Sequence, residues 1–297
     1  MRSMAATTKP VCNRDGGGCA LRRFALTGPM AGLSPIPLAF GRKEDYNQDM
    51  DAWPYEVHDP HILTLRAAEL WAWVAEDAVR ARSVAHIAIS GGSTPRPLFK
   101  LLASSQWLDR IPWARTHIWW VDERCVPPDH PHSNFGVAYA LLLRRLPVVI
   151  THRIRGEESD PQRAAALYEK EIMETLGLAS WQWPRFDLVL LGMGEDGHTA
   201  SLFPGDPALT ARDRLVTAGR APSSPRNRVT LTLPAINQAA YVIFLVAGAG
   251  KGPALHRIVH REDPHPLPAS LVEPENGRLL WLLDKAAADA AEIPFLK

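Results

Sequence analysis

The stretch DLVLLGMGEDGH, residues 187–198, indicates the class of fold. Its first half, residues 187–192, is apolar without alternation, which is typical of a strand covered on both faces of a sheet. Its second half is a glycine-rich loop that ends in His198. A buried strand of this kind is characteristic of α/β proteins, in which helices cover both faces of a mostly parallel sheet.

Similar apolar runs lie elsewhere in the chain, and amphipathic segments of helix length separate them. The predicted strands are residues 55–58, 86–90, 117–121, 187–192, 229–233, 241–247 and 279–283. The predicted helices are residues 62–82, 95–104, 133–145, 160–176, 251–260 and 284–292. We therefore predict a single three-layer α/β domain over residues 51–297, with a mostly parallel, Rossmann-like sheet and helices on both faces.

Four glycine-rich or charged clusters begin where predicted strands end. They are residues 91–95, 122–124, 193–198 and 248–251. Ligands of open parallel sheets bind beyond the carboxyl ends of the strands. If the four strands are parallel, the clusters share one rim, and we expect the functional site there.

The cluster SGGSTP, residues 90–95, has the composition of an anion-binding loop. Gly91 and Gly92 let backbone amides approach an anion, and Ser93 and Thr94 add hydroxyl donors. The alternative is a tight strand-to-helix turn that merely uses glycine.

Residues 192–197 match the G-x-G-x-x-G pattern of dinucleotide-binding proteins. Pro204 interrupts any following helix within two turns, and no acidic residue ends a following strand, so we expect no nicotinamide cofactor. His198 comes next, and a histidine on such a loop can be both exposed and held in place, as a general base requires. The alternative is a loop histidine that caps a turn.

Composition excludes several classes of protein. With 33 Lys and Arg against 32 Asp and Glu, the formal net charge of +1 does not favour nucleic acid or an anionic membrane as partner. The longest nearly unbroken apolar stretch, residues 239–250, is too short to cross a bilayer. The three cysteines do not make a disulfide framework, so we expect a cytoplasmic protein. No sequence feature sets an oligomeric state.

Two clusters resemble metal-ligand sets. Cys125, His130 and His132 lie in a proline-rich segment, and His256 and His260 stand four residues apart. Neither cluster has the spacing of a known zinc site, so we predict no metal.

The amino-terminal segment differs from the rest of the chain. Residues 1–43 carry seven Lys and Arg against Asp15 alone, contain several glycines and prolines, and show no sustained periodicity. We predict that residues 1–50 are a disordered basic tail outside the fold. A targeting peptide and a true start near Met50 are the alternatives.

Several motifs occur together and in order from about residue 54 to the end. They are SGGSTP (90–95), WWVDERCV (119–126), SNFG (133–136), DLVLLGMGEDGHTASLFP (187–204), RVTLTLPAIN (228–237), VAGAGK (246–251) and WLLDKAAA (281–288). The chain thereby resembles the 6-phosphogluconolactonases, within the glucosamine-6-phosphate isomerase/deaminase-like superfamily. The block that contains His198 is highly specific for them.

The resemblance implies hydrolysis of 6-phospho-D-glucono-1,5-lactone to 6-phosphogluconate in the oxidative pentose phosphate pathway, without a cofactor. It implies His198 as the general base, and Arg124 as the candidate that stabilises charge on the carbonyl oxygen. The loop of Gly91, Gly92, Ser93 and Thr94, together with Arg228 and Lys251, would hold the phosphate. Asp122 or Asp196 would orient His198, and the sequence does not choose between them.

The sequence leaves three alternative functions open. An aminosugar-phosphate isomerase/deaminase would use Asp122 as a carboxylate base, but Arg124 stands where those enzymes carry an aromatic residue. A sugar-phosphate-sensing regulator would need a DNA-binding module, and residues 1–50 lack the two patterned helices of a helix-turn-helix. A non-catalytic binder would keep nearly the same site residues.

Overall fold

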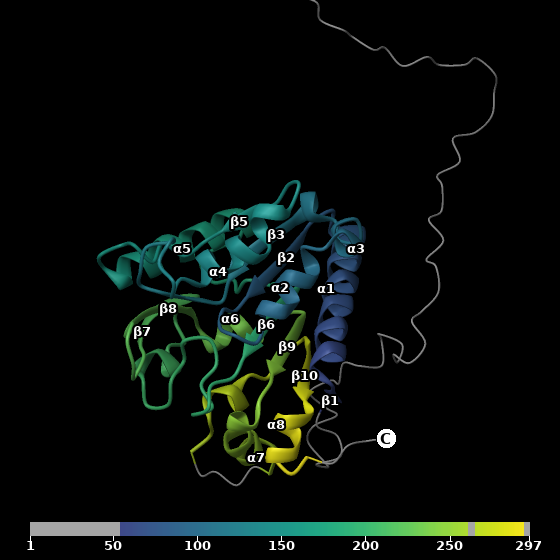
Figure 1. Cartoon of the computed structure of the whole chain (residues 1–297). Helices are drawn as coiled ribbons and strands as arrows, with labels where there is room; N and C mark the ends of the chain where they lie inside the picture. The colour runs from purple at the N-terminus through teal and green to yellow at the C-terminus, as the bar shows by residue number, and fades with distance from the viewer. Residues whose placement is uncertain (1–53, 261–264, 294–297) are drawn as a thin grey trace, which may run out of the picture. The chain divides into compact units, whose positions relative to one another are not determined.

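A seven-stranded parallel sheet forms the centre of the structure (Figure 1). The computed structural model describes residues 54–260 and 265–293, so the predicted tail lies outside the described residues. From edge to edge the strands are β1 (Tyr55–His58), β10 (Arg278–Asp284), β9 (Tyr241–Val246), β6 (Leu188–Gly192), β2 (Ala85–Ile89), β3 (Thr116–Trp120) and β5 (Ile150–His152). The predicted mostly parallel α/β fold is confirmed.

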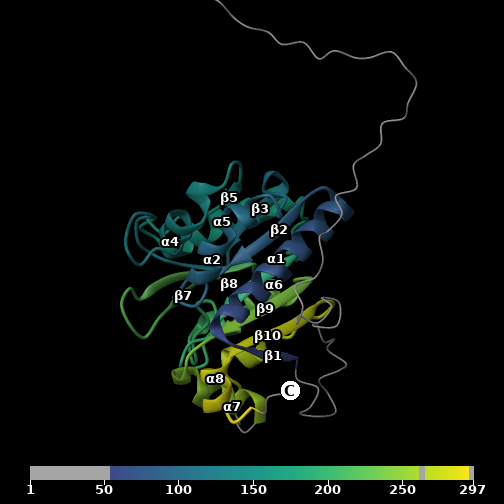
Figure 2. The ribbon, with the colours of Figure 1, turned by 45° about the vertical axis from the view of Figure 1, so that its right-hand side comes forward.

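Helices cover the sheet on both faces (Figures 1 and 2). The α-helices are α1 (Pro60–Arg82), α2 (Arg96–Leu102), α3 (Ser105–Leu108), α4 (Asn134–Leu141), α5 (Pro161–Leu176), α6 (Leu233–Asn237), α7 (Gly252–His260) and α8 (Lys285–Ala290). Helices α1 and α2 pack together, and α5 places Tyr168 against Trp119 of the sheet. Within the described ranges, no helix is both long and apolar enough to cross a bilayer.

The ends of the helices carry the capping residues that the sequence suggests. Asp160 caps α5 by accepting a hydrogen bond from the backbone of Gln162, and Gly177 ends the helix with φ +64°. The helix predicted over residues 133–145 is shorter than expected. Ser133 caps α4 by accepting from the backbone of Gly136, but a 3-10 turn, Leu143–Arg145, replaces its last part.

Strands β2, β3, β6 and β9 are parallel neighbours or near neighbours, so their carboxyl ends share one rim as predicted. A small antiparallel sheet of β4 (Asp122–Arg124), β8 (Asn227–Leu231) and β7 (Val216–Arg220) stands at this rim. The strand predicted over residues 229–233 belongs to that sheet and not to the parallel one. Val121 is the single residue between β3 and β4, so the chain passes directly from one sheet to the other.

A cluster of histidines lies where α5 packs on the sheet. His117 Nδ1 is 2.9 Å from His152 Nε2, and His152 Nδ1 is 2.7 Å from a carboxylate oxygen of Glu171 on α5. The Trp119 indole donates to Nδ1 of His86, whose ring centroid is 4.8 Å from that of His117. Burial, followed by the charges of its neighbours, lowers the pKa of His86 from 6.5 to about 4.

The neutral state of His86 makes the stability of the fold sensitive to acid. His86 lies beside His117, His152 and Arg82, while Asp187 accepts hydrogen bonds from Arg82 and from the His86 backbone. Between pH 6.5 and about 4 the unfolded chain protonates at this position and the folded chain does not. The free energy of unfolding should therefore decrease as the pH is lowered across this window, by up to about 1.4 kcal/mol per pH unit for this group.

Denaturant unfolding at several pH values measures this slope. His86→Gln keeps an acceptor for the indole but cannot titrate, so it should flatten the slope. His61→Asn changes an exposed histidine of α1 and should leave the slope as it is in the wild type. Equal slopes in the wild type and His86→Gln would contradict the prediction.

Candidate active site

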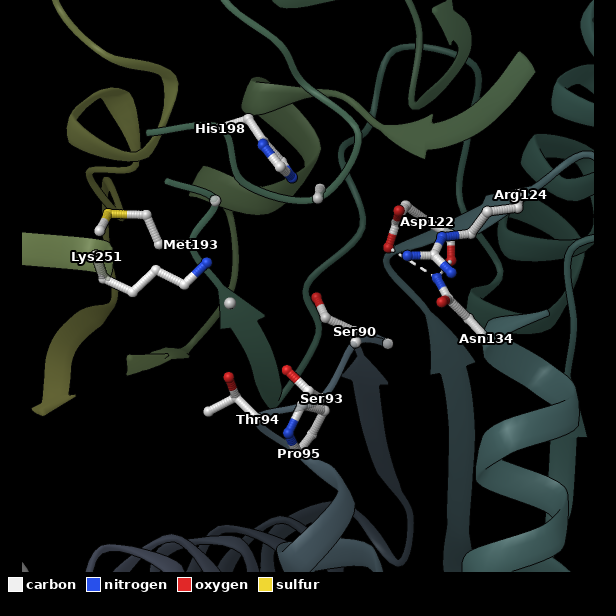
Figure 3. Close-up of a pocket in the computed structure, with 15 residues that line it drawn as sticks. Ser90, Ser93, Thr94, Pro95, Asp122, Arg124, Asn134, Met193, His198 and Lys251 are labelled. Atoms are coloured by element: carbon white, nitrogen blue, oxygen red, sulfur yellow. Dashed lines mark hydrogen bonds between the residues drawn. The ribbon is translucent and has the colours of Figure 1, made fainter. Parts of the chain in front are cut away.

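One pocket lies at the rim where the carboxyl ends of the parallel strands meet (Figure 3). All four predicted clusters contribute to its wall. The lining residues are Ser90, Gly91, Gly92, Ser93, Thr94, Pro95, Asp122, Arg124, Asn134, Gly192, Met193, Gly194, His198, Ala200 and Lys251. Clusters more than 150 residues apart in sequence thus form one site.

His198 is held by a carboxylate two residues before it in the chain. Its Nδ1 is 2.5 Å from Oδ1 of Asp196, which also accepts a hydrogen bond from the His198 backbone. Burial alone would raise the pKa of Asp196, but the hydrogen bond and the charge of His198 lower it. A carboxylate at Nδ1 makes that nitrogen the protonated one, which leaves Nε2 as the acceptor. The imidazole is 31% exposed and lines the pocket.

The loop that carries His198 is closed by its own backbone. The Gly194 amide donates to the His198 carbonyl and the Gly197 amide donates to the Gly194 carbonyl. Gly197 adopts φ +77°, which favours glycine. The phenyl ring of Phe203 packs against the imidazole, with ring centroids 4.4 Å apart. The loop therefore positions the histidine without enclosing it.

Asp122 is held by other partners. Its Oδ2 accepts a hydrogen bond of 2.6 Å from the Ser201 hydroxyl, and its Oδ1 accepts one of 3.2 Å from the side-chain amide of Asn134. The amide of Asn134 also donates to the Asp122 carbonyl. The structure thus places Asp196, not Asp122, against His198.

Two arginines stand opposite each other in the small sheet. Arg124 of β4 pairs with Arg228 of β8, and Arg124 also donates to the His132 carbonyl at 2.7 Å. Arg228 is 7% exposed, and among the described residues its Nε and Nη1 have no hydrogen-bond partner. Burial and the neighbouring Arg124 charge lower the pKa of Arg228. A buried arginine with two unused donors is suited to an anionic ligand.

The opposite side of the pocket is also rich in donors. Figure 3 shows the Lys251 ammonium pointing into the pocket across from Ser93 and Thr94. The Ser90 hydroxyl is buried at the same wall and has no partner within the described part of the chain. These groups offer hydrogen bonds and positive charge to a small anion.

Most predicted site residues line this pocket, but two do not. Asp196 stands behind His198 and Arg228 pairs with Arg124 behind the lining. The sequence prediction missed Ser90, Asn134 and Ser201 as members of the site. All three lie in motifs of the family, SGGSTP (90–95), SNFG (133–136) and DLVLLGMGEDGHTASLFP (187–204), so membership of these motifs was the available signal.

The candidate metal and dinucleotide motifs lie in surroundings that do not favour such ligands. Among residues 54–260 and 265–293, no three His, Cys, Asp or Glu side chains gather as a metal site. Burial raises the pKa of the Cys125 thiol to about 11, which disfavours the thiolate that binds metals. The glycines of residues 192–197 precede a short β-bridge, Thr199 to Leu202, instead of a helix that could receive a pyrophosphate.

Known proteins are similar to this chain in sequence and in fold. The family model described as glucosamine-6-phosphate isomerases/6-phosphogluconolactonase matches residues 58–281. A 6-phosphogluconolactonase from Synechocystis sp. is 44% identical over 215 residues, which are 71% of this chain and 87% of the relative. The solved 6-phosphogluconolactonase of Trypanosoma cruzi has a TM-score of 0.71 at 32% identity, covering 79% of this chain and 95% of that one. A solved monomeric glucosamine-6-phosphate deaminase has a TM-score of 0.65 at 18% identity, covering 80% of this chain and 99% of its own, which shows the fold alone. This chain belongs to the glucosamine-6-phosphate isomerase/6-phosphogluconolactonase family.

Proposed function

We propose that this chain hydrolyses 6-phospho-D-glucono-1,5-lactone to 6-phosphogluconate, the reaction of the oxidative pentose phosphate pathway. The observation that carries the proposal is the pair of His198 and Asp196 in a pocket whose other walls offer donors to an anion. The names of the relatives at 44% and 32% identity support the same reaction.

In the proposed mechanism His198 Nε2 accepts a proton from water while the water oxygen attacks the lactone carbonyl carbon. Asp196 holds the Nδ1 proton and stabilises the imidazolium that forms. Arg124 is our candidate to stabilise negative charge on the carbonyl oxygen. When the bond between the carbonyl carbon and the ring oxygen breaks, His198 returns its proton to that ring oxygen.

The phosphate would be bound away from the reacting carbon. The loop of Gly91, Gly92, Ser93 and Thr94 supplies backbone and hydroxyl donors, and Lys251 supplies positive charge from the opposite wall. Such an anchor positions the lactone carbonyl, so binding energy from a part of the substrate that does not react contributes to the rate.

Two observations favour hydrolysis over the isomerase/deaminase chemistry of the same fold. That chemistry needs a carboxylate base, and both oxygens of Asp122 already accept hydrogen bonds from Asn134 and Ser201. The second observation is that Arg124, which stands where the isomerase/deaminases carry an aromatic residue, lines the pocket. A cytoplasmic location stays a prediction, as does the assignment of residues 1–50 to a tail outside the fold.

Incubation of the purified protein with freshly prepared 6-phosphogluconolactone tests the proposal. Appearance of acid above the spontaneous rate, with no ammonia released from glucosamine 6-phosphate, is the expected result. Ammonia release without lactone opening would indicate the deaminase. Binding of 6-phosphogluconate without either reaction would indicate a non-catalytic protein.

Loss of either phosphate-binding charge should weaken the preference for a phosphorylated lactone. Lys251→Ala removes a charge-assisted contact worth about 1.5–3 kcal/mol, or roughly 10- to 100-fold in kcat/KM. Arg228 does not line the pocket, so Arg228→Ala tests whether its two unused donors beside Arg124 reach the phosphate, and we expect a loss of the same size. The measurement compares kcat/KM for 6-phosphogluconolactone and for unphosphorylated gluconolactone. The second substrate should be little affected. If the ratio is unchanged in one variant, that residue does not bind the phosphate.

A further inference from the structure

Glu123 lies between two pocket residues but points away from the pocket. Successive side chains of a strand face opposite sides, so Asp122 and Arg124 of β4 line the pocket while Glu123 faces the interior. Its side chain is buried, and the residue is 2% exposed. The proposed mechanism gives this buried carboxylate no part.

Four hydrogen bonds converge on the Glu123 carboxylate. Oε1 accepts from the backbone amides of Arg124 at 2.8 Å and Asn134 at 2.7 Å. Oε2 accepts from the backbone amide of Phe135 at 2.8 Å and from the hydroxyl of Ser133 at 3.1 Å. One donor belongs to strand β4, and three belong to the cap and first turn of helix α4. The carboxylate therefore joins these two elements directly.

The joined elements form one side of the pocket. Asn134, the first residue of α4, donates to both the carbonyl and the carboxylate of Asp122. The phosphate loop rests on the same side chain, because a Cβ on Gly91 would lie only 1.8 Å from Asn134 Oδ1. A shift of α4 relative to β4 would thus displace a pocket carboxylate, a pocket arginine and the phosphate loop together.

We propose that Glu123 is a positioning residue, whose carboxylate fixes β4 to the first turn of α4 and thereby sets the places of the pocket side chains on both elements. The inference rests on the proposed lactonase function. It differs from simple helix capping, because a cap alone would affect the stability of the fold and leave the geometry of the pocket unchanged.

The pKa of Glu123 is raised, mainly by burial and also by the charge of Asp122. The backbone amides of Phe135, Asn134 and Arg124 oppose that rise, because they donate to the ionised carboxylate. Glutamine has nearly the same shape but presents an NH₂ group where one oxygen accepts two hydrogens. Glu123→Gln should therefore leave the Phe135 amide without an acceptor and weaken the connection between β4 and α4, without opening a cavity.

Glu169 provides a matched control. Its carboxylate on α5 also accepts two backbone amides, those of Leu215 at 2.7 Å and Val216 at 3.0 Å, and it is not part of the pocket lining. Glu169→Gln makes the same chemical change at a site that joins α5 to the small sheet. Both amides donate to one oxygen, Oε2, which the glutamine carbonyl can replace, so this variant should leave the kinetics of the folded enzyme unchanged.

The test measures kcat, KM, the pH profile and 6-phosphogluconate affinity, all per folded protein. In Glu123→Gln we expect kcat/KM to fall about 10- to 100-fold, because small misplacements of catalytic groups can lower the rate by that much. Binding of 6-phosphogluconate should also weaken. The shape of the pH profile should not change, because Glu123 does not touch His198. Wild-type kinetics in Glu123→Gln, or changes equal to those in Glu169→Gln, would overturn the inference.

Ser133→Ala keeps the inference testable if Glu123→Gln does not fold. It removes one donor to Glu123 and the cap of α4, and we expect a smaller fall in kcat/KM. Its control is Asp160→Ala, which removes the cap of α5 and should leave the kinetics unchanged. If the wild type does not open the lactone at all, the proposed function is wrong. The 6-phosphogluconate affinities of the same variants then decide on Glu123 separately.

Discussion

Replacement of His198 by asparagine is expected to lower kcat for lactone hydrolysis by about 10²- to 10⁴-fold, the contribution typical of a general base. Asparagine keeps a polar side chain of similar reach but cannot accept the proton of the attacking water at neutral pH. The loop is closed by backbone hydrogen bonds between Gly194, Gly197 and His198, so its shape should survive the change. The phosphate anchor at Ser93, Thr94 and Lys251 is untouched, and 6-phosphogluconate should bind as before.

Initial rates must be corrected for spontaneous opening of the lactone, which would hide a small residual activity. His61→Asn, at an exposed position of α1, is the matched control and should keep the wild-type rate. A corrected rate within about threefold of the wild type would remove His198 from the role of base.

The rim could be predicted because its signal is local. Each cluster directly follows an apolar run, and in a parallel sheet the ends of such runs meet on one side. His198 and Lys251 are far apart in the sequence, yet strand ends alone bring them to the same pocket. The family motifs point to the same residues.

The small antiparallel sheet could not be predicted in this way. Strand β4 has three residues, all charged, and no apolar pattern distinguishes it from a loop. Its pairing with β8 depends on a contact across more than 100 residues. The choice between Asp122 and Asp196 as the partner of His198 could not be predicted either, because it depends on a contact between distant residues. Ser201 binds Asp122 from 79 positions away, and this hydrogen bond engages the carboxylate that could otherwise have faced the histidine.

A methyl group at Gly194 should abolish most activity without unfolding the protein. The added Cβ of Gly194→Ala would lie 2.0 Å from His198 Nδ1 and 2.5 Å from Asp196 Oδ1, inside the hydrogen bond that joins them. The two side chains must separate to make room, and the imidazole then loses its orientation. We expect a fall in kcat of about 10²-fold, because a misplacement near 1 Å can cost that much.

The loss should come from displacement and not from instability, and a control variant, the thermal midpoint and a double variant separate these causes. Gly177→Ala, at the positive-φ end of α5, should destabilise the fold by roughly 1 kcal/mol and keep its kcat, because Gly177 does not line the pocket. In Gly194→Ala the thermal midpoint should change little, because the side chains that must move are about one-third exposed or more. The double variant Gly194→Ala/His198→Asn should be scarcely slower than His198→Asn, since both changes act on the same base. If the two losses multiply instead, Gly194 affects the reaction through something other than His198.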